Sequence, residues 1–231
     1  MTERSDPSEM LARAWEANAD LWVRAVRDQR IASRTAGADA AVVAAIVERR
    51  AQRVLDLGCG EGWLVRRLTQ ETGGTTVGIE RSARLVEAAR AADPAGDYRQ
   101  SSFEEFVTAP DTVGTRFNAA VFNYALFDDA AADLLATAAS VLVPGGVVVV
   151  QTLHPWAIAG EHYADGWRVE DFTGIAAPGE AWEPMPWYFR TMQSWAAVIR
   201  DAGLAIEDLR EPPAPDGGPP LSLLLVAGRT A

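Results

Sequence analysis

The chain has 231 residues, 48% of them hydrophobic, which is enough to bury one sizeable core, so a single domain is expected. Asp and Glu outnumber Lys and Arg by 32 to 21, and the resulting charge of −11 disfavours nucleic acid as a partner. The single cysteine, Cys59, excludes an internal disulfide framework and a structural thiolate zinc site.

The first fifty residues are expected to be helical. Apolar side chains recur at spacings of three and four over residues 6–30, which predicts an amphipathic helix, and a second helix is expected over 38–50. The opening residues 1–6 lack the basic-then-apolar order of a secretory signal, and no run of eighteen apolar residues follows. A soluble, cytoplasmic protein without membrane contact is therefore expected.

Strand-like and helix-like segments then alternate as far as residue 152. Such repeats require parallel strand pairing with helices on both faces, so a doubly wound sheet is predicted. The run 147–150 contains valine alone, as expected for a central strand that is buried on both sides. The expected strands are 53–57, 75–80, 97–101, 117–123 and 146–152, and the expected helices are 63–69, 83–92 and 130–142.

The alternation lapses for almost forty residues after 152, in a stretch rich in Gly, Pro and Trp. A helix over 192–202 follows, and then strands over 204–209 and 221–227. The proline-rich segment 211–220 must be the loop between these strands, because prolines cannot donate into a strand ladder. An antiparallel final hairpin completes a mostly parallel, seven-stranded sheet with an antiparallel last strand.

A glycine turn follows the first expected strand, within residues 54–62. Glycines are required at Gly58, Gly60 and Gly62 because side chains there would block a ligand from the backbone amides, and because the turn can demand a positive φ. The free amides and the start of the next helix favour an anionic or electron-rich ligand group.

Two residues distinguish this turn from a nicotinamide or flavin site, and a third indicates a ribose. Trp63 occupies the position where a third Gly or Ala would let helix and strand pack closely around a pyrophosphate. Asp56, directly before the turn, suits an ammonium group better than a phosphate. Glu80 ends the second strand, where it can accept hydrogen bonds from both ribose hydroxyls. The inferred ligand is a nucleoside with an amino-acid-like extension.

The segments 54–62, 78–82, 117–123 and 142–147, in this order, resemble the motif series of class I S-adenosylmethionine-dependent methyltransferases. The resemblance covers residues 53–152 and, more loosely, the last two strands. It implies a Rossmann-like α/β fold, S-adenosylmethionine as cofactor, S-adenosylhomocysteine as product and no metal.

The resemblance also implies roles for individual residues of the glycine turn. Gly58, Cys59 and Gly60 would lie along the methionine part of the cofactor. Asp56 would engage its amino group, directly or through water, and Glu80 would clamp the ribose. Cys59 is otherwise interpreted as a small residue in a tight turn.

Further roles follow at the ends of the later strands. Arg81 would line the adenine. Ser102 holds the place where this family often has an Asp that binds the adenine amino group, and Phe103 backbone and ring contacts would supply adenine recognition in its absence. Asn123 would lie beneath the methionine chain, near the transferable methyl group.

The aromatic stretch 155–190 is predicted to be an acceptor cap, because inserts after the fifth strand cover the strand ends where ligands bind. The alternative is that these rings form a satellite core under a long loop. The expected domain is then one unit over residues 1–231, divided into an N-terminal helical segment (1–50), a cofactor-binding core (51–152), the aromatic cap (153–190) and a final helix with its strand pair (191–231).

His154 and Tyr124 are the candidate catalytic residues. His154 stands at the end of the fifth strand, and an imidazole is the natural base near neutral pH, whereas His162 in the cap is a weaker candidate. Tyr124, beside Asn123, would orient the acceptor. The alternatives are that His154 only hydrogen-bonds a turn, that Tyr124 only packs, and that positioning suffices for catalysis.

Other polar and aromatic residues favour structural interpretations. A helix docked on the sheet edge is preferred to a lid as the interpretation of Trp15, Asn18 and Trp22. Arg34 is expected to be solvated, in preference to binding the carboxylate of the methionine part. The acids 128–129 are expected to be helix N-caps, because no further metal ligands are visible.

The predicted function is methyl transfer from S-adenosylmethionine to an oxygen or nitrogen of a small, partly apolar metabolite. Two alternatives stay open at this point. One is an S-adenosylmethionine-binding protein that transfers no methyl group, and the other is a tRNA or rRNA methyltransferase, which would need a basic face. A nicotinamide oxidoreductase is disfavoured by Trp63. The sequence does not indicate an oligomeric state.

Overall fold

The computed structural model describes residues 6–214 and 217–230, so residues 1–5, the loop positions Pro215 and Asp216, and Ala231 lie outside the described residues. A seven-stranded sheet with the order β3-β2-β1-β4-β5-β9-β8 forms the centre of the molecule. Its strands are β1 (Arg53–Leu57), β2 (Thr75–Glu80), β3 (Asp97–Gln100), β4 (Phe117–Asn123), β5 (Leu142–Leu153), β8 (Leu204–Arg210) and β9 (Ser222–Arg229).

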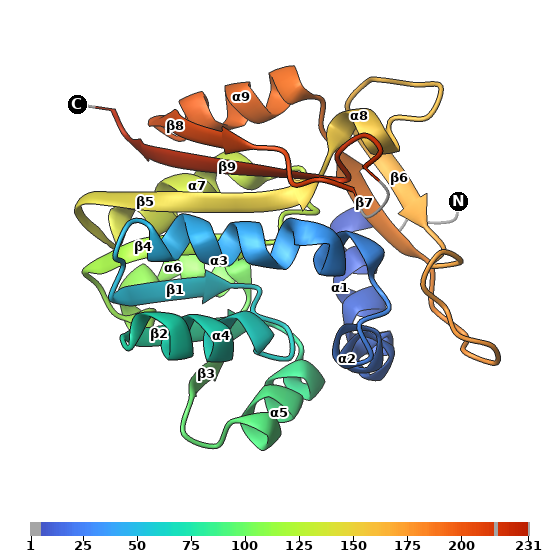
Figure 1. The fold of residues 1–231 in the computed structure, drawn as a ribbon, viewed down its shortest axis with the longest axis horizontal. Coiled ribbons are helices and arrows are strands. Elements are labelled where there is room, and N and C mark those ends of the chain that lie inside the picture. Colours follow the sequence, from blue (N-terminus) through green and yellow to red (C-terminus); the bar gives the residue numbers. More distant parts are fainter. Residues whose placement is uncertain (1–5, 215–216, 231) are drawn as a thin grey trace.

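The predicted fold class is confirmed. Strands β1 to β5 pair in parallel, and β9 runs antiparallel to both of its neighbours, β5 and β8. The last strand is thus antiparallel, as expected, and it inserts between β5 and β8. The carboxyl ends of the parallel strands all point toward one side of the molecule, where the N-terminal helices and a small hairpin lie (Figure 1).

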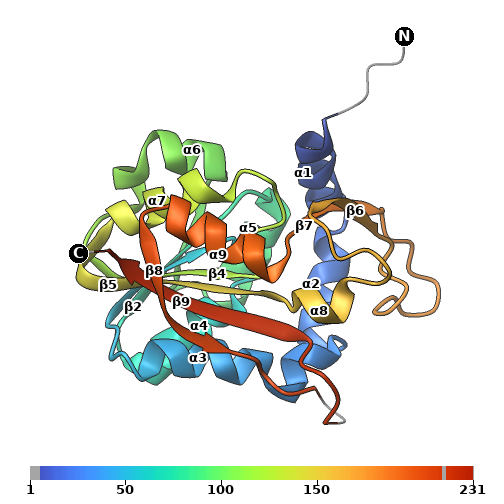
Figure 2. The ribbon, with the colours of Figure 1, turned by 90° about the horizontal axis from the view of Figure 1, so that it is seen from above.

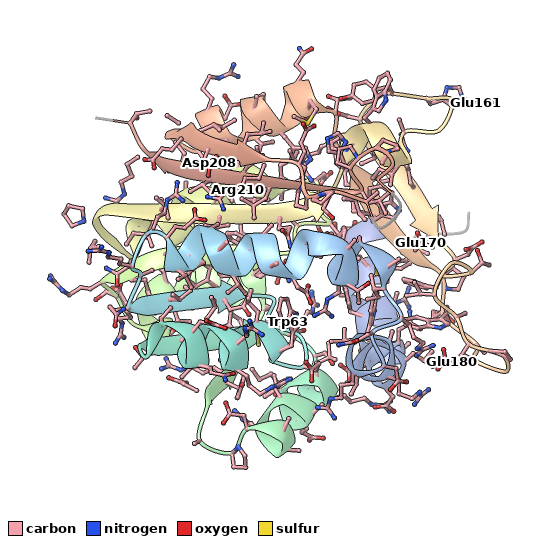
Figure 3. All side chains as sticks on the ribbon, viewed as in Figure 1. Trp63, Glu161, Glu170, Glu180, Asp208 and Arg210 are labelled. Atoms are coloured by element: carbon pink, nitrogen blue, oxygen red, sulfur yellow. The ribbon has the colours of Figure 1, made fainter. Side chains whose placement is uncertain are left out.

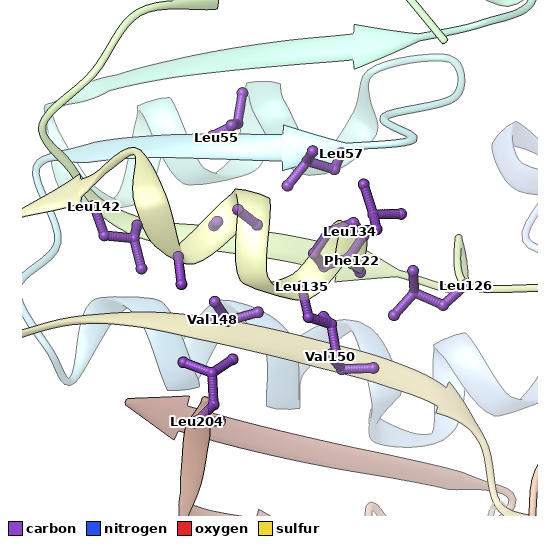
Figure 4. Packing of buried hydrophobic residues seen from close by; sticks show 14 of the residues in the cluster. Leu55, Leu57, Phe122, Leu126, Leu134, Leu135, Leu142, Val148, Val150 and Leu204 are labelled. Atoms are coloured by element: carbon purple, nitrogen blue, oxygen red, sulfur yellow. The ribbon is translucent and has the colours of Figure 1, made fainter. Parts of the chain in front are cut away.

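Helices cover both faces of the sheet. Helices α3 (Asp39–Val47) and α4 (Trp63–Thr72) lie on one face, and α6 (Phe103–Thr108), α7 (Ala131–Ser140) and α9 (Met192–Asp201) lie on the other (Figure 2). Helix α5 (Ala83–Ala92) packs on β2 and β3. Side chains of β5 alternate between the two cores, with Val147 and Val149 under α3 and α4, and Val148 and Val150 on the α7 side (Figure 4).

The N-terminal segment differs from its prediction. A single helix over 6–30 is wrong, because α1 (Pro7–Ala17) ends at Asn18 and α2 (Ala19–Arg27) begins after it. The Asn18 side-chain amide donates to the Glu183 carbonyl and accepts from the Glu183 N–H, at 2.8 Å each. Helix α1 packs against the hairpin strand β7 and not on the sheet edge, so that expectation is wrong as well.

The stretch after β5 contains structure that the sequence did not predict. A short helix, α8 (Pro155–Ile158), is followed by an antiparallel pair, β6 (Gly166–Glu170) and β7 (Met185–Phe189). The Tyr188 N–H donates to the Phe127 carbonyl at 2.8 Å, which ties this hairpin to the loop after β4. Two other short turns are a π-helix (Arg34–Ala38) and a 3-10 helix (Pro110–Val113). Among the described residues, no helix combines the length and apolarity needed to cross a membrane.

Candidate active site

A cavity of about 800 Å³ lies at the carboxyl ends of the parallel strands. Its walls come from the turn after β1, the ends of β2 and β4, the helix pair α1–α2 and the hairpin β6–β7. In an open α/β sheet this crevice is where ligands bind. The predicted site residues that line it are Asp56, Gly58, Cys59, Gly60, Glu80, Arg81, Phe103, Asn123 and Tyr124.

The glycine turn adopts backbone angles that only glycine tolerates easily. The φ angles of Gly58, Gly60 and Gly62 are 77°, 56° and 82°. A Cβ at Gly58 would lie 2.7 Å from the Ala125 Cβ, and one at Gly62 would lie 2.5 Å from the Tyr98 ring. A Cβ at Gly60 would meet no atom within 4 Å, because this residue faces the cavity. Gly58 and Gly62 therefore serve packing, whereas Gly60 keeps the turn open.

The carboxylate of Asp56 is buried without a partner at the end of β1. The residue is 1% exposed, and neither carboxylate oxygen accepts a hydrogen bond from any described residue. Burial, and secondarily the nearby charge of Glu80, raise the pKa of Asp56 to about 8. An unpartnered buried carboxylate is costly, so its presence at the cavity wall is typical of a binding site.

Glu80 bridges the glycine turn and the start of α5. Its Oε2 accepts the Gly60 N–H at 3.1 Å, and its Oε1 accepts the Ser82 N–H at 2.8 Å. Burial raises the pKa of Glu80, and these two hydrogen bonds oppose that shift. Each oxygen of a carboxylate has a second lone pair, so both oxygens can accept one more hydrogen bond from a ligand.

The structure brings Arg81 and Phe103 to the cavity but not Ser102. The Ser102 hydroxyl accepts the Glu105 N–H at 3.1 Å, and the Glu105 carboxylate accepts the Ser102 N–H at 2.8 Å, which forms a capping box at the start of α6. Ser101 lines the cavity in its place. The spacing Ser-x-x-Glu over residues 102–105 is the signature that would have indicated this cap.

Asn123 and Tyr124 follow one another at the end of β4. The Asn123 Oδ1 accepts a hydrogen bond from the Gln151 Nε2 at 2.9 Å. Tyr124 has a φ of 52°, which is rare for a bulky residue, and its hydroxyl hydrogen-bonds the Ser222 hydroxyl. Burial raises the pKa of Tyr124, so its phenol stays protonated near neutral pH. Backbone strain of this kind clusters at functional sites.

The structure does not bring His154 to the cavity. Its Nδ1 accepts the Trp156 N–H at 3.3 Å as the N-cap of α8, and its Nε2 lies 2.8 Å from Glu211 Oε1. Neither His154 nor the exposed His162 is among the lining residues. A catalytic role of His154 stays a prediction that its position does not favour.

Aromatic residues from the N-terminal helices and from the stretch 155–190 form one cluster. Trp22 stacks on Trp15 at 5.1 Å between ring centroids and meets Phe172 and Trp182 edge-on at 5.4 and 5.2 Å. Only some of the tryptophans predicted for the cap face the cavity. Trp187 lines it, whereas Trp156 is 71% exposed. Three cavity-lining rings come from elsewhere in the chain: Trp15 and Trp22, for which a lid was the disfavoured alternative, and Phe127, which sequence reasoning missed.

Two expectations for charged residues are wrong. Arg34 is not solvated, because it donates to both Asp39 oxygens at 2.9 and 3.0 Å and lies 4.4 Å above the Trp63 ring. The N-cap of α7 is Ala130, whereas the Asp128 Oδ1 accepts the Asp129 N–H at 2.7 Å within a turn. No group of three potential metal ligands occurs in the described part of the chain.

Comparisons with known proteins agree with this geometry. Residues 54–146 match the family model of a methyltransferase domain. An S-adenosylmethionine-dependent methyltransferase from Mesorhizobium loti is 25% identical, with a TM-score of 0.65 over 83% of this chain and 98% of that chain. No curated protein sequence matches.

Two more distant structures cover both chains completely. DesVI from Streptomyces venezuelae is 20% identical with a TM-score of 0.58. Magnesium protoporphyrin IX methyltransferase from Synechocystis, solved with bound S-adenosylmethionine, is 15% identical with a TM-score of 0.64. These comparisons agree with the motif series and with the cavity at the strand ends: residues 54–146 match a methyltransferase domain, and the chain shares the fold of S-adenosylmethionine-dependent methyltransferases.

Proposed function

We propose that the enzyme binds S-adenosylmethionine in the cavity and transfers its methyl group to an oxygen or nitrogen of a small, partly apolar acceptor. The observation that carries the proposal is the Asp56 carboxylate, which is buried, has no partner among the described residues and lines the same cavity as Gly60. An ammonium group there would supply the missing partner, and the amino-acid end of S-adenosylmethionine carries one.

The other cofactor contacts follow from the order of residues along the cavity wall. Gly58, Cys59 and Gly60 lie along the amino-acid chain in this proposal, and Glu80 accepts hydrogen bonds from the ribose hydroxyls. Burial raises the pKa of the Cys59 thiol, so it serves as a neutral wall of the site. Asn123, which lines the cavity at the end of β4, is assigned to the reacting end in this proposal.

The adenine is assigned to the wall beyond Glu80. Arg81, Ser101 and Phe103 line the cavity there, so they take the adenine in place of the expected Ser102. The backbone groups and hydroxyl of Ser101 can supply hydrogen bonds to a base edge.

The acceptor is assigned to the other end, between α1, α2 and the hairpin. S-adenosylmethionine supplies, when bound, a methyl group that the positive sulfonium activates. The protein's contribution is to hold the nucleophile in line with it, worth up to ~7–11 kcal/mol in well-oriented systems, and to exclude water with aromatic walls. Such rings also attract a sulfonium by roughly 0.5–2 kcal/mol. No general base is required for this contribution.

Calorimetry with S-adenosylmethionine and S-adenosylhomocysteine tests the cofactor assignment, and absence of binding of both at millimolar concentration would overturn it. An acceptor screen that measures S-adenosylhomocysteine formation then tests the acceptor class. Binding to bulk tRNA that weakens steeply with salt would instead indicate a nucleic-acid substrate.

Gly60→Ala is expected to weaken binding of S-adenosylmethionine about five- to a hundredfold, because the new methyl group enters the cavity and overpacking costs about 1–3 kcal/mol. Gly73→Ala is the matched control. Gly73 has a similar φ of 64° and equally open surroundings, but it ends α4 outside the cavity lining. Both variants should lose similar thermal stability. Equal cofactor affinity of the two would contradict a ligand next to Gly60.

Tyr124→Phe is expected to lower kcat about two- to tenfold, because it removes one neutral hydrogen-bonding hydroxyl from the acceptor end. Affinity for S-adenosylhomocysteine should stay within twofold of the wild type, about the error of calorimetry. Ser222→Ala is the control, since it removes the hydroxyl partner of Tyr124 but does not line the cavity. Steady-state kinetics in which both variants lose the same activity would assign Tyr124 a packing role only.

A further inference from the structure

The acceptor end of the cavity carries an unbalanced negative charge. We propose that it binds a compound with an apolar or aromatic body and a positively charged amine, and that Glu170 recognises this amine. The inference rests on the proposed function, since it assigns the other end of the same cavity to the cofactor.

Among the described residues, the arginines that line the cavity are already paired with carboxylates. The sequence contains no lysine, so arginine is the only strong base available. Three arginines line the cavity, and each faces a carboxylate. Arg30 donates to both Glu180 oxygens at 2.8 and 3.2 Å, Arg34 donates to Asp39, and Arg81 lies 3.7 Å from Glu104. An anionic acceptor would therefore meet no unpaired arginine among the described residues of the lining.

Most of the carboxylates that line the cavity also already have a partner. The proposed function assigns Asp56 and Glu80 to the cofactor. Glu61 accepts from Arg27 at 2.9 Å and from Arg66 at 2.8 Å, and Glu16 lies 3.7 Å from Arg84. One oxygen of Asp128 accepts the backbone N–H groups of residues 129 and 130.

Two lining carboxylates, Asp128 and Glu170, form no ion pair with a described residue, but the Arg190 guanidinium lies beside Asp128 and donates to its backbone carbonyl. Glu170 is therefore the better candidate to bind a ligand cation. It ends β6 opposite Met185, lines the cavity and is partly buried (Figure 3). Its Oε1 accepts the Phe172 N–H at 2.7 Å, and within the described residues it forms no ion pair. A carboxylate that is fixed by a backbone hydrogen bond and lacks a counter-charge is a ready partner for a ligand cation.

Aromatic rings surround the same region. Phe172 is held two residues from Glu170 with a φ of 61°, and Trp187 lies in the lining on the paired strand. Phe127 and Trp187 meet edge-on at 6.5 Å. Ring faces attract ammonium groups and also pack against an apolar ligand body, so carboxylate and rings select the same chemistry.

The test uses three indole compounds that share one ring system and differ in the charge of the side chain: tryptamine, tryptophol and indole-3-acetate. Calorimetry measures their affinity for the enzyme saturated with S-adenosylhomocysteine. Tryptamine is expected to bind about tenfold more tightly than tryptophol, because it gains one hydrogen bond between charged groups. Indole-3-acetate is expected to bind most weakly.

Glu170→Gln is expected to remove most of the tryptamine preference while tryptophol affinity stays unchanged. Glutamine keeps the Oε1 that accepts the Phe172 N–H, so the variant changes the charge but not the local fold. Glu161→Gln is the matched control, because Glu161 is exposed on the loop between α8 and β6 and lies outside the cavity lining (Figure 3). It should bind all three compounds like the wild type.

The proposal is overturned if indole-3-acetate binds as tightly as tryptamine, if tryptamine binding is undetectable at millimolar concentration, or if Glu170→Gln retains the full preference. Affinity for S-adenosylhomocysteine and the melting temperature are measured for every variant. Failure of the wild type to bind S-adenosylhomocysteine would refute the proposed function, whereas intact binding without the amine preference would refute only the role of Glu170.

Discussion

Replacing Asp56 with asparagine is expected to weaken binding of S-adenosylmethionine by about two to four orders of magnitude and to stabilise the ligand-free protein at alkaline pH. The loss of affinity follows from leaving the ligand ammonium without its carboxylate, for which breaking a buried pair costs about 3–5 kcal/mol. The gain in stability follows from removing a buried charge that has no partner in the ligand-free protein.

The pH window comes from the pKa of Asp56, which rises from 3.8 to about 8 on folding. Between these values the folded protein holds a proton that the unfolded chain releases, so this group contributes stability at low pH that is lost as the pH rises to about 8. The unfolding free energies of wild type and Asp56→Asn should therefore agree near pH 4. They should diverge by a few kcal/mol above pH 8, which denaturant titration measures.

The affinity for the cofactor should depend on pH through the same protonation of Asp56. Because the ammonium requires ionised Asp56, affinity of the wild type for S-adenosylmethionine should rise from pH 6 toward pH 7.5, and Asp56→Asn should lose this dependence. Adenosine is the control ligand, since it lacks the amino-acid end and should bind both proteins equally. Calorimetry that finds no pH dependence in the wild type would remove Asp56 from the ammonium site.

Glu80→Ala is expected to weaken binding of S-adenosylmethionine by about 2–4 kcal/mol, the value of two charge-assisted hydrogen bonds to the ribose. The carboxylate also accepts the backbone N–H groups of Gly60 and Ser82, so a loss of affinity by itself would not locate the ribose. A second ligand pair separates these effects. The wild type should prefer adenosine to 2′-deoxyadenosine, and Glu80→Ala should bind both with the same affinity.

Glu104→Ala serves as the matched control for Glu80→Ala. Glu104 also lines the cavity, but its side chain is 73% exposed and forms an ion pair with the exposed Arg81. Its removal should change cofactor affinity by less than about 1 kcal/mol. If Glu80→Ala keeps the preference for the ribose 2′-hydroxyl, then Glu80 supports the glycine turn and does not bind the ribose.

The sequence by itself determined the sheet and the part of the site that lies on it. Apolar runs at residues 53–57, 75–80 and 117–123 match the observed strands β1, β2 and β4 residue for residue. Burial in a parallel strand leaves a continuous apolar pattern that can be read locally. Asp56, Glu80 and Asn123 follow from the same pattern, because carboxyl ends of parallel strands meet at one edge.

The tertiary structure decided which of the neighbouring polar residues reach the cavity. The Ser102 hydroxyl caps α6, and Ser101 lines the cavity instead. The His154 side chain hydrogen-bonds Glu211, which lies 57 residues further along the chain. Asn18 ends α1 through Glu183, 165 residues away, and this contact helps to bring the N-terminal helices against the hairpin. Periodicity reports burial within one element, whereas the direction of a loop side chain depends on partners that only folding brings close.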